Sequence, residues 1–330
     1  MSIAREQLID LARRETEQRA ASNEILSGYL IGSVARGDPS LGDAMDIDLV
    51  LVHRHEPTTA REIVRLSHQV HLDILHHSRV FYDRPSRLRI DPWMGPALCE
   101  PVFLYDPEHF FEWAQAGARG QFFRPDHVYA RAQAFLSRSR QASSLLPLSG
   151  RWLRTFLRAL LDAANAVASL DGFPVAGRRL SLHLADIATR LDCPWLLAQF
   201  HQLLGVEHLH RFDLPQHLNA WARACDAAMA SGGDPTLLPC RRDYYLKAFQ
   251  ALADAGRGPA ILWNLLWTWE EFIYLLGHKP DARPHRDAWR QALMELGLGP
   301  DQRAERAQSL ECIIQKHGAY IEAWGERHGA

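Results

Sequence analysis

Two aspartates, Asp46 and Asp48, stand one residue apart at the start of an apolar run that ends at Val52. In a β-strand, residues i and i+2 point to the same face, so this pair would present two carboxylates side by side. Two like charges repel and resist burial, and a divalent cation such as Mg²⁺ relieves both problems because it prefers carboxylate oxygens. The pair therefore indicates a metal site. The alternative is a strand that merely begins at the solvent edge of a sheet.

A turn that could hold phosphate precedes the acid pair. The apolar run of residues 25–31 ends at Gly32 and Ser33, and Arg36 follows shortly after. Glycine lets the backbone approach a ligand closely, and a helix that starts here would direct N–H groups at an anion. We therefore expect Gly32 and Ser33 to bind nucleotide phosphates. Arg36 would either add positive charge there or lie in solvent.

A third carboxylate, Asp73, lies in the middle of the apolar, strand-like run of residues 70–75. An acid in such a run is costly unless a metal ion or a hydrogen bond compensates for it. A phosphate-sized turn, a paired acid and a third acid on a neighbouring strand together describe a two-metal phosphoryl-transfer site.

These residues resemble the nucleotidyltransferase superfamily typified by DNA polymerase beta. The family pattern is Gly-Ser, an interval of about a dozen residues, and then an acid–apolar–acid strand, with a further acid on a later strand. Here the interval between Gly32-Ser33 and Asp46-Ile47-Asp48 is slightly longer, and Met45 stands where Ser, Thr or Asp is commoner. The resemblance covers roughly the first hundred residues. It implies an enzyme that transfers a nucleotidyl group, here AMP from ATP, to an acceptor hydroxyl.

In such an enzyme the three carboxylates have distinct expected roles. Asp46 and Asp48 would bridge two Mg²⁺ ions, and Asp73 would complete the second metal site and accept the hydroxyl proton. Gly32 and Ser33 would hold the β- and γ-phosphates with backbone N–H groups and a hydroxyl. Positioning and charge neutralisation would then account for most of the catalysis.

The composition is that of an ordinary globular protein, with a nearly balanced formal charge of −2 and no global basicity. The five cysteines are scattered without a metal-type or disulfide-type spacing, which fits a reducing cytoplasm. The N-terminal stretch carries charges inside an amphipathic pattern and is not a signal peptide, and no apolar run approaches the length of a membrane span. We therefore expect a cytoplasmic protein with no membrane partner. Neither a P-loop nor a G-x-G-x-x-G motif is present.

The elements that must position these residues follow from the apolar pattern. Helices are expected at residues 2–20, 57–66 and 108–116, and strands at 25–31, 46–52, 70–75 and 102–105. A segment rich in Pro and Arg, residues 84–96, is expected to interrupt regular structure. This order predicts an α+β fold: a small mixed β-sheet forming a nucleotidyltransferase domain, residues 1–120.

Residues 121–330 are expected to form an all-α helical domain that binds the substrate or a partner. Helices are predicted near residues 152–164, 181–191, 195–204, 215–230, 241–254, 260–276, 286–296 and 301–324, with breaks at Gly- and Pro-containing stretches such as 232–235. Trp267, Glu270 and Glu271 share one helix face and could bind a cationic, sugar-bearing acceptor. The alternative is an ordinary helix with Trp267 packed inside and both glutamates in water.

A zinc site is a weaker hypothesis for the histidines that cluster in the first part of the chain. They lack a paired short spacing on one element, so hydrogen-bonded or solvated histidines are the preferred interpretation. They are His53, His55, His71, His76 and His77.

Three function classes remain open on the sequence alone. The preferred one is transfer to a small hydroxyl compound such as an aminoglycoside-like antibiotic, which the near-neutral charge favours. The second is transfer to an RNA 3′ end or a protein, as in toxin–antitoxin nucleotidyltransferases, which the arginine-rich stretches 84–89 and 151–158 favour. The third is an inactive nucleotide-binding module, which the retention of all three aspartates argues against.

Overall fold

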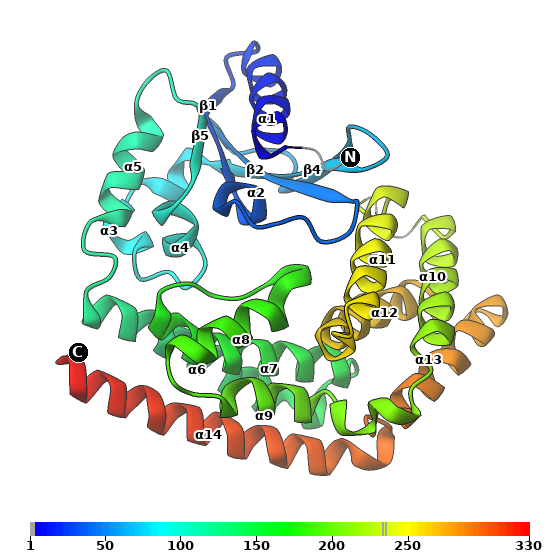
Figure 1. The fold of residues 1–330 in the computed structure, drawn as a ribbon. Helices are drawn as coiled ribbons and strands as arrows, with labels where there is room; N and C mark the ends of the chain where they lie inside the picture. The colour runs from blue at the N-terminus through cyan, green and yellow to red at the C-terminus, as the bar shows by residue number, and fades with distance from the viewer. Residues whose placement is uncertain (1–3, 233, 235) are drawn as a thin grey trace. The chain divides into compact units, whose positions relative to one another are not determined.

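The computed structural model describes residues 4–232, 234 and 236–330 (Figure 1). Contacts along the chain divide it into two compact units, Met1–His127 and Val128–Ala330. The first unit contains a five-stranded sheet, and the regular elements described for the second are helices. The predicted α+β class is therefore confirmed. The boundary expected between residues 120 and 121 lies shortly before the division that the structure has.

The sheet of the first unit is mixed, with the strand order β3-β4-β2-β1-β5. The central strand β2 pairs in parallel with β4 and antiparallel with β1. The edge strands are β3, antiparallel to β4, and β5, antiparallel to β1. The strands are β1 (Ile25–Ile31), β2 (Met45–His53), β3 (Arg61–Arg65), β4 (Val70–Ser78) and β5 (Val102–Tyr105).

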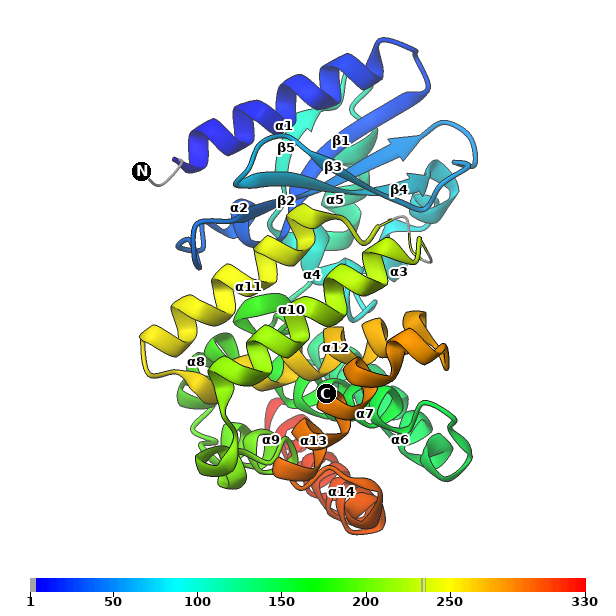
Figure 2. The same cartoon turned by 90° about the vertical axis from the view of Figure 1, so that its right-hand side faces the viewer.

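Helices cover both faces of this sheet. Helix α1 (Arg5–Ala20) lies across one face, and α5 (Phe110–Arg119) packs on the other (Figure 2). Residues 2 and 3 of the predicted first helix lie outside the described residues. The segment expected to interrupt regular structure instead contains two short helices, α3 (Pro85–Leu88) and α4 (Met94–Cys99), after the 3₁₀ turn η1 (Arg79–Tyr82).

Burial on both faces explains why β2 reads as a nearly continuous apolar run. Its Ile47, Leu49 and Leu51 point into the core beneath α1, whereas Val50 and Val52 point into the core beneath α5. Each of these side chains contributes roughly 1.5–3 kcal/mol by its removal from water. This burial fixes the register of β2, because a slip by one residue would exchange its two faces.

The helix predicted for residues 57–66 is wrong. The structure has the edge strand β3 there, paired antiparallel with β4. The apolar spacing of Ala60, Ile63 and Val64 suggests a helix, but the same residues also fit a strand with Ile63 and Val64 on opposite faces. Two β-branched residues and a free edge beside β4 favour the strand, and these tertiary partners are not evident from local periodicity.

The second unit is built from helices that match the predicted ones within a few residues, preceded by α6, for which no bounds were predicted. Residues 233 and 235 of the predicted break lie outside the described residues. No helix among the described residues combines the length and the apolarity that a membrane crossing requires. The helices are α6 (Pro125–Leu145), α7 (Trp152–Ala168), α8 (Leu180–Arg190), α9 (Trp195–Leu203), α10 (Leu214–Ala230), α11 (Pro239–Asp254), α12 (Leu262–Leu276), α13 (Arg283–Glu295) and α14 (Arg303–His328).

Candidate active site

The three predicted aspartates lie on the same face of the sheet. In the parallel ladder of β2 and β4, Asp48 is the direct partner of Asp73, and Asp46 is the partner of His71. Adjacent partners in a sheet point to the same side, and Asp46 and Asp48 share that side because they are two residues apart. Asp46 and Asp73 are only 8% and 5% exposed, respectively. The strands therefore bring three acids together at one end of the face that also carries the α5 core.

Gly32 lies directly against the carboxylate of Asp48. Ile31, at the end of β1, pairs with Asp48 across the antiparallel ladder, and Gly32 then turns the chain with a φ of 73°. A Cβ atom on Gly32 would lie 1.9 Å from Oδ2 of Asp48, so a side chain cannot be accommodated without displacing that carboxylate. The backbone of the predicted phosphate turn and the acid pair are thus in immediate contact, and only glycine permits this approach.

Ser33 is half-buried in the first turn of the short helix α2 (Gly32–Arg36), where its carbonyl oxygen accepts a hydrogen bond of 2.9 Å from the Asp38 N–H. The side chain of Arg36 forms an exposed ion pair of 2.9 Å with Asp38. The C-terminal end of α2 is tied down by Arg5 of α1, which donates hydrogen bonds of 2.7 and 2.6 Å to the carbonyl oxygens of Val34 and Ala35. The turn is therefore restrained by its own backbone hydrogen bond and by the side chain of Arg5.

Asp73 has a partner that the sequence did not indicate. Arg61 of β3 donates from Nε to Oδ1 of Asp73 at 2.7 Å and from Nη2 to Oδ2, a two-pronged contact. The Arg61 side chain is 45% exposed, whereas that of Asp73 is 6% exposed. The third acid is therefore already compensated by a cation of the chain itself.

The aspartates fit a magnesium ion as a pair more readily than as a trio. No group of three or more His, Cys, Asp or Glu side chains within the described part of the chain is arranged to hold a metal ion. Mg²⁺ needs only one or two protein carboxylates, since waters and substrate phosphates supply the remaining oxygens. Asp46 and Asp48 would meet that requirement from one strand face, so the Mg²⁺ ion would need no third protein ligand.

The histidines at the C-terminal ends of β2 and β4 are hydrogen-bonded. Nε2 of His53 lies 2.8 Å from Nδ1 of His76, and Nδ1 of His77 lies 2.7 Å from the hydroxyl of Tyr82. That hydroxyl also lies 2.6 Å from the hydroxyl of Tyr29 in the core. Burial lowers the pKa of all three histidines, so each favours the neutral form. Burial likewise raises the pKa of Tyr29. These histidine nitrogens are therefore engaged in hydrogen bonds within the fold.

In the second unit, the predicted acceptor-binding face is occupied by arginines of the same unit. Arg151 donates from Nε to Glu270 at 3.0 Å and from Nη2 to Glu271 at 2.9 Å. The Arg154 guanidinium lies 3.4 Å from the centroid of the Trp267 ring and 3.2 Å from Glu271. The aromatic ring and both carboxylates are thus already engaged with cations. A cationic acceptor would have to displace an arginine from each of them.

Burial and hydrogen bonding shift the pKa values of Arg151 and Arg154 in opposite directions. Burial acts to lower the pKa of Arg151, but its hydrogen bonds to Glu270 and Glu271 outweigh burial and raise the pKa. For Arg154 burial dominates and lowers the pKa. Arg151 and Arg154, two of the three arginines in the stretch 151–158 that was considered for RNA binding, are therefore used within the fold.

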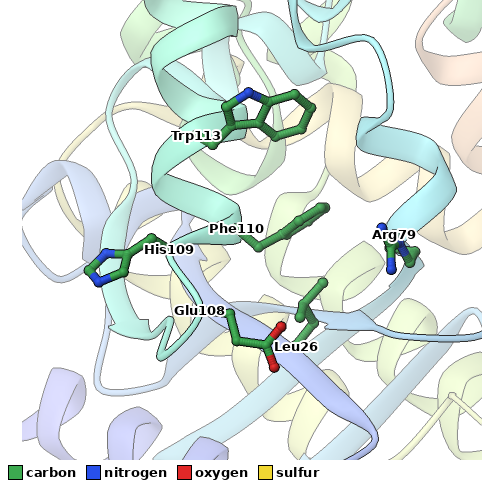
Figure 3. A pocket seen from close by; sticks show the side chains of 6 residues that line it. All are labelled: Leu26, Arg79, Glu108, His109, Phe110 and Trp113. Atoms are coloured by element: carbon green, nitrogen blue, oxygen red, sulfur yellow. The ribbon is translucent and has the colours of Figure 1, made fainter.

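A separate hollow of about 260 Å³ lies elsewhere on the first unit. In Figure 3, Phe110 lies between Trp113 and Glu108, with Arg79 on the opposite side of the opening. Its β1 residue is Leu26, near the start of that strand, whereas Gly32 and Asp48 meet at the strand's other end. The hollow is therefore not part of the acidic face.

Sequence reasoning missed Arg61, which belongs to the same face as the acids. Its partner in the register of β3 and β4 is Leu75, two residues from Asp73 and on the same side. Residues 61–65 show no polar–apolar alternation, and the β-branched pair Ile63 and Val64 is the local signal that favours a strand here.

Comparison with known proteins gives little further information. No protein-family model matches the chain, and no curated protein matches it. Among solved structures, the chain is similar to a nucleotidyltransferase-like protein from Exiguobacterium sibiricum 255-15, with 13% sequence identity and a TM-score of 0.30. The match covers 88% of this chain and 92% of that one. At this TM-score the similarity carries no argument about the site.

Proposed function

We propose that this chain transfers a nucleotidyl group from an NTP to an acceptor hydroxyl, on the sheet face that carries Asp46 and Asp48. The observation that supports this most directly is the contact between Gly32 and Asp48. A glycine turn that can approach phosphates is thereby placed against a carboxylate that can hold a metal ion. Nucleotidyl transfer needs these two features next to each other.

The residues of this face have complementary roles in the proposal. The backbone of Gly32 and the hydroxyl of Ser33 bind the β- and γ-phosphates of the NTP and orient its α-phosphate toward the acceptor. Asp46 and Asp48 are the pair that would hold Mg²⁺. When bound, this ion would neutralise phosphate charge and favour the deprotonated acceptor hydroxyl. Asp46 is buried and Asp48 half-buried, so both carboxylates would act in a partly desolvated setting where their charge has a stronger effect.

ATP as the NTP and a small hydroxyl compound as the acceptor are the finer part of the proposal. The near-neutral charge of −2 favours a small acceptor over RNA, because phosphate-backbone recognition draws on many lysines and arginines. Arg151 and Arg154, which could have supported RNA binding, are engaged with glutamates.

The test is a transfer assay with α-labelled NTPs and Mg²⁺, in which total RNA, lysate protein and a panel of aminoglycoside-like compounds are offered in parallel. We expect label on a small compound, and Asp46→Asn or Asp48→Asn should reduce transfer by several orders of magnitude. Asp43→Asn is the matched control, since Asp43 is exposed in the loop just before β2.

Near wild-type turnover in Asp46→Asn or Asp48→Asn would contradict the proposed site. Label on RNA or protein would keep the reaction but reassign the acceptor. A wild-type protein that binds NTP without any Mg²⁺-dependent turnover would instead identify an inactive nucleotide-binding module.

A further inference from the structure

We propose that Asp73 is a positioning residue that holds Arg61, and that Arg61 binds the phosphates of the incoming NTP. This inference rests on the proposed function, because it names a further phosphate-binding residue for the same site. It departs from the expectation that Asp73 is a third metal ligand and a base.

Four groups of opposite or complementary chemistry lie in order across the sheet face. Residues from four neighbouring strands follow one another: Arg61 on β3, Asp73 on β4, Asp48 on β2 and Gly32 at the end of β1. Arg61 contacts Asp73, and Asp48 contacts Gly32. The arginine therefore lies on the same face as the proposed phosphate turn, with the acidic residues between them.

Separating Asp73 from Arg61 would leave a buried charge without this cation. The Asp73 side chain is almost fully buried and beside Asp48, so its charge requires a nearby cation. Arg61 supplies this cation through the two-pronged geometry in which guanidinium and carboxylate match best. A metal ion at Asp73 would compete with Arg61 for the same two oxygens, and Mg²⁺ needs only one or two protein carboxylates, which Asp46 and Asp48 would supply. Asp73 is thus better suited to orient Arg61 than to bind metal.

Arg61 is both accessible and held in direction. It is the solvent-accessible half of the pair, nearly half exposed, and its guanidinium is fixed in direction by Asp73. A planar guanidinium held in place recognises phosphate oxygens with little further loss of side-chain freedom. A triphosphate that approaches this face also meets the negative charge of Asp46 and Asp48. A preset arginine offsets that repulsion.

The experiment separates metal binding from nucleotide binding. Mn²⁺ affinity is measured by electron paramagnetic resonance without nucleotide, and ATP affinity by calorimetry without metal. We expect Asp73→Asn to leave the Mn²⁺ affinity within about twofold of the wild type, while Asp48→Asn abolishes it. Arg61→Gln should weaken ATP binding and raise the KM for ATP about tenfold to a hundredfold, the range for loss of a charge-assisted hydrogen bond.

Three further variants test the coupling. Arg61→Lys keeps the positive charge but lacks the planar, two-pronged arrangement of donors. It should bind ATP more tightly than Arg61→Gln and more weakly than the wild type. Asp73→Asn should weaken ATP binding in the same direction as Arg61→Gln, and the double variant should be no worse than Arg61→Gln alone. The double variant removes both charges of the pair. It should therefore stay folded even if Arg61→Gln alone, which leaves the buried Asp73 charge without this cation, does not. Arg65→Gln is the matched control, because Arg65 lies on the same strand face and bonds instead to the Ser67 carbonyl oxygen and His68.

Loss of Mn²⁺ binding in Asp73→Asn would overturn the inference and make Asp73 a ligand. Unchanged ATP affinity in Arg61→Gln would overturn it as well. Both results are read without turnover, so they remain distinct from a failure of the proposed function, in which the wild-type protein transfers no label.

Discussion

The carboxylate of Asp48 lies so close to the Cα of Gly32 that any side chain at position 32 would have to displace it. A methyl group on Gly32 would come within 1.9 Å of Oδ2, and the φ of 73° already places this residue in the left-handed region. A backbone turn and an acidic side chain are thus fitted to each other before any ligand is bound.

Gly32→Ala should therefore abolish transfer. The left-handed backbone alone costs about 1–2 kcal/mol for a non-glycine residue, and the Cβ must additionally displace the Asp48 carboxylate. The thermal midpoint and the transfer rate are the measurements. Gly37→Ala is the control, because Gly37 has a φ of 75° but its Cβ would meet only Arg5, at 3.5 Å. If both variants lost stability equally and kept activity, the contact would have no functional meaning.

Asp48→Asn should leave the stability of the metal-free protein unchanged or slightly increased. Asp48 is the direct cross-strand neighbour of Asp73, so the substitution removes a repulsion between two acids. Urea unfolding with and without Mg²⁺ is the measurement. Mg²⁺ should stabilise the wild type by mass action and the variant far less. Equal stabilisation of both proteins by Mg²⁺ would place the metal elsewhere.

Stability should fall as the pH is lowered from about 6.5 to about 4, in part because of His317. Burial lowers the pKa of His317 to about 4 from the ordinary 6.5, although its hydrogen bond to the carbonyl oxygen of Ala163 acts in the opposite direction. The unfolded chain then binds more protons across this window, so the contribution is complete above it and is lost as the pH falls. The slope from one such group is at most about 1.4 kcal/mol per pH unit.

Denaturant unfolding at a series of pH values measures this slope. His317→Asn keeps a donor for the Ala163 carbonyl oxygen but cannot titrate, so its profile should be flatter than that of the wild type. His210→Gln is the control, since His210 is exposed in the same unit. A wild-type profile that is flat over this range would contradict the assignment.

Arg151→Ala should destabilise the protein without altering the KM for the acceptor. It leaves Glu270 and Glu271 adjacent without their shared cation, and the pair is only partly exposed, so a loss of about 1–3 kcal/mol is expected. Arg158→Ala, an exposed change on the same helix, should cost less. Arg151→Ala or Trp267→Ala variants with normal stability and a raised acceptor KM would restore the acceptor-binding interpretation of this face.

The strands that carry the acids could be predicted because their signals are local. An apolar run that ends at Gly32 and an acid pair that opens the next run are visible within a few residues, and burial of β2 on both faces enforces the same answer. Most helices of the second unit followed from their period for the same reason.

The parts that sequence reasoning missed depend on partners far along the chain. Residues 61–65 form a strand because β4 offers a free edge, and Arg61 is meaningful only next to Asp73. Glu270 and Glu271 lie together in α12 and both accept from Arg151. Arg151 is the residue just before α7, more than a hundred positions earlier, and no local pattern connects it to the glutamates.

The hydrogen bonds from Arg5 to the carbonyl oxygens of Val34 and Ala35 connect the first turn of α1 to the end of α2, the proposed phosphate turn. The geometry next to the acids is therefore set partly by residues at the very beginning of the described chain. Changes made there for convenience, such as an added purification sequence or a trimmed first helix, would therefore reach the turn beside Asp48 and need a control in any activity measurement.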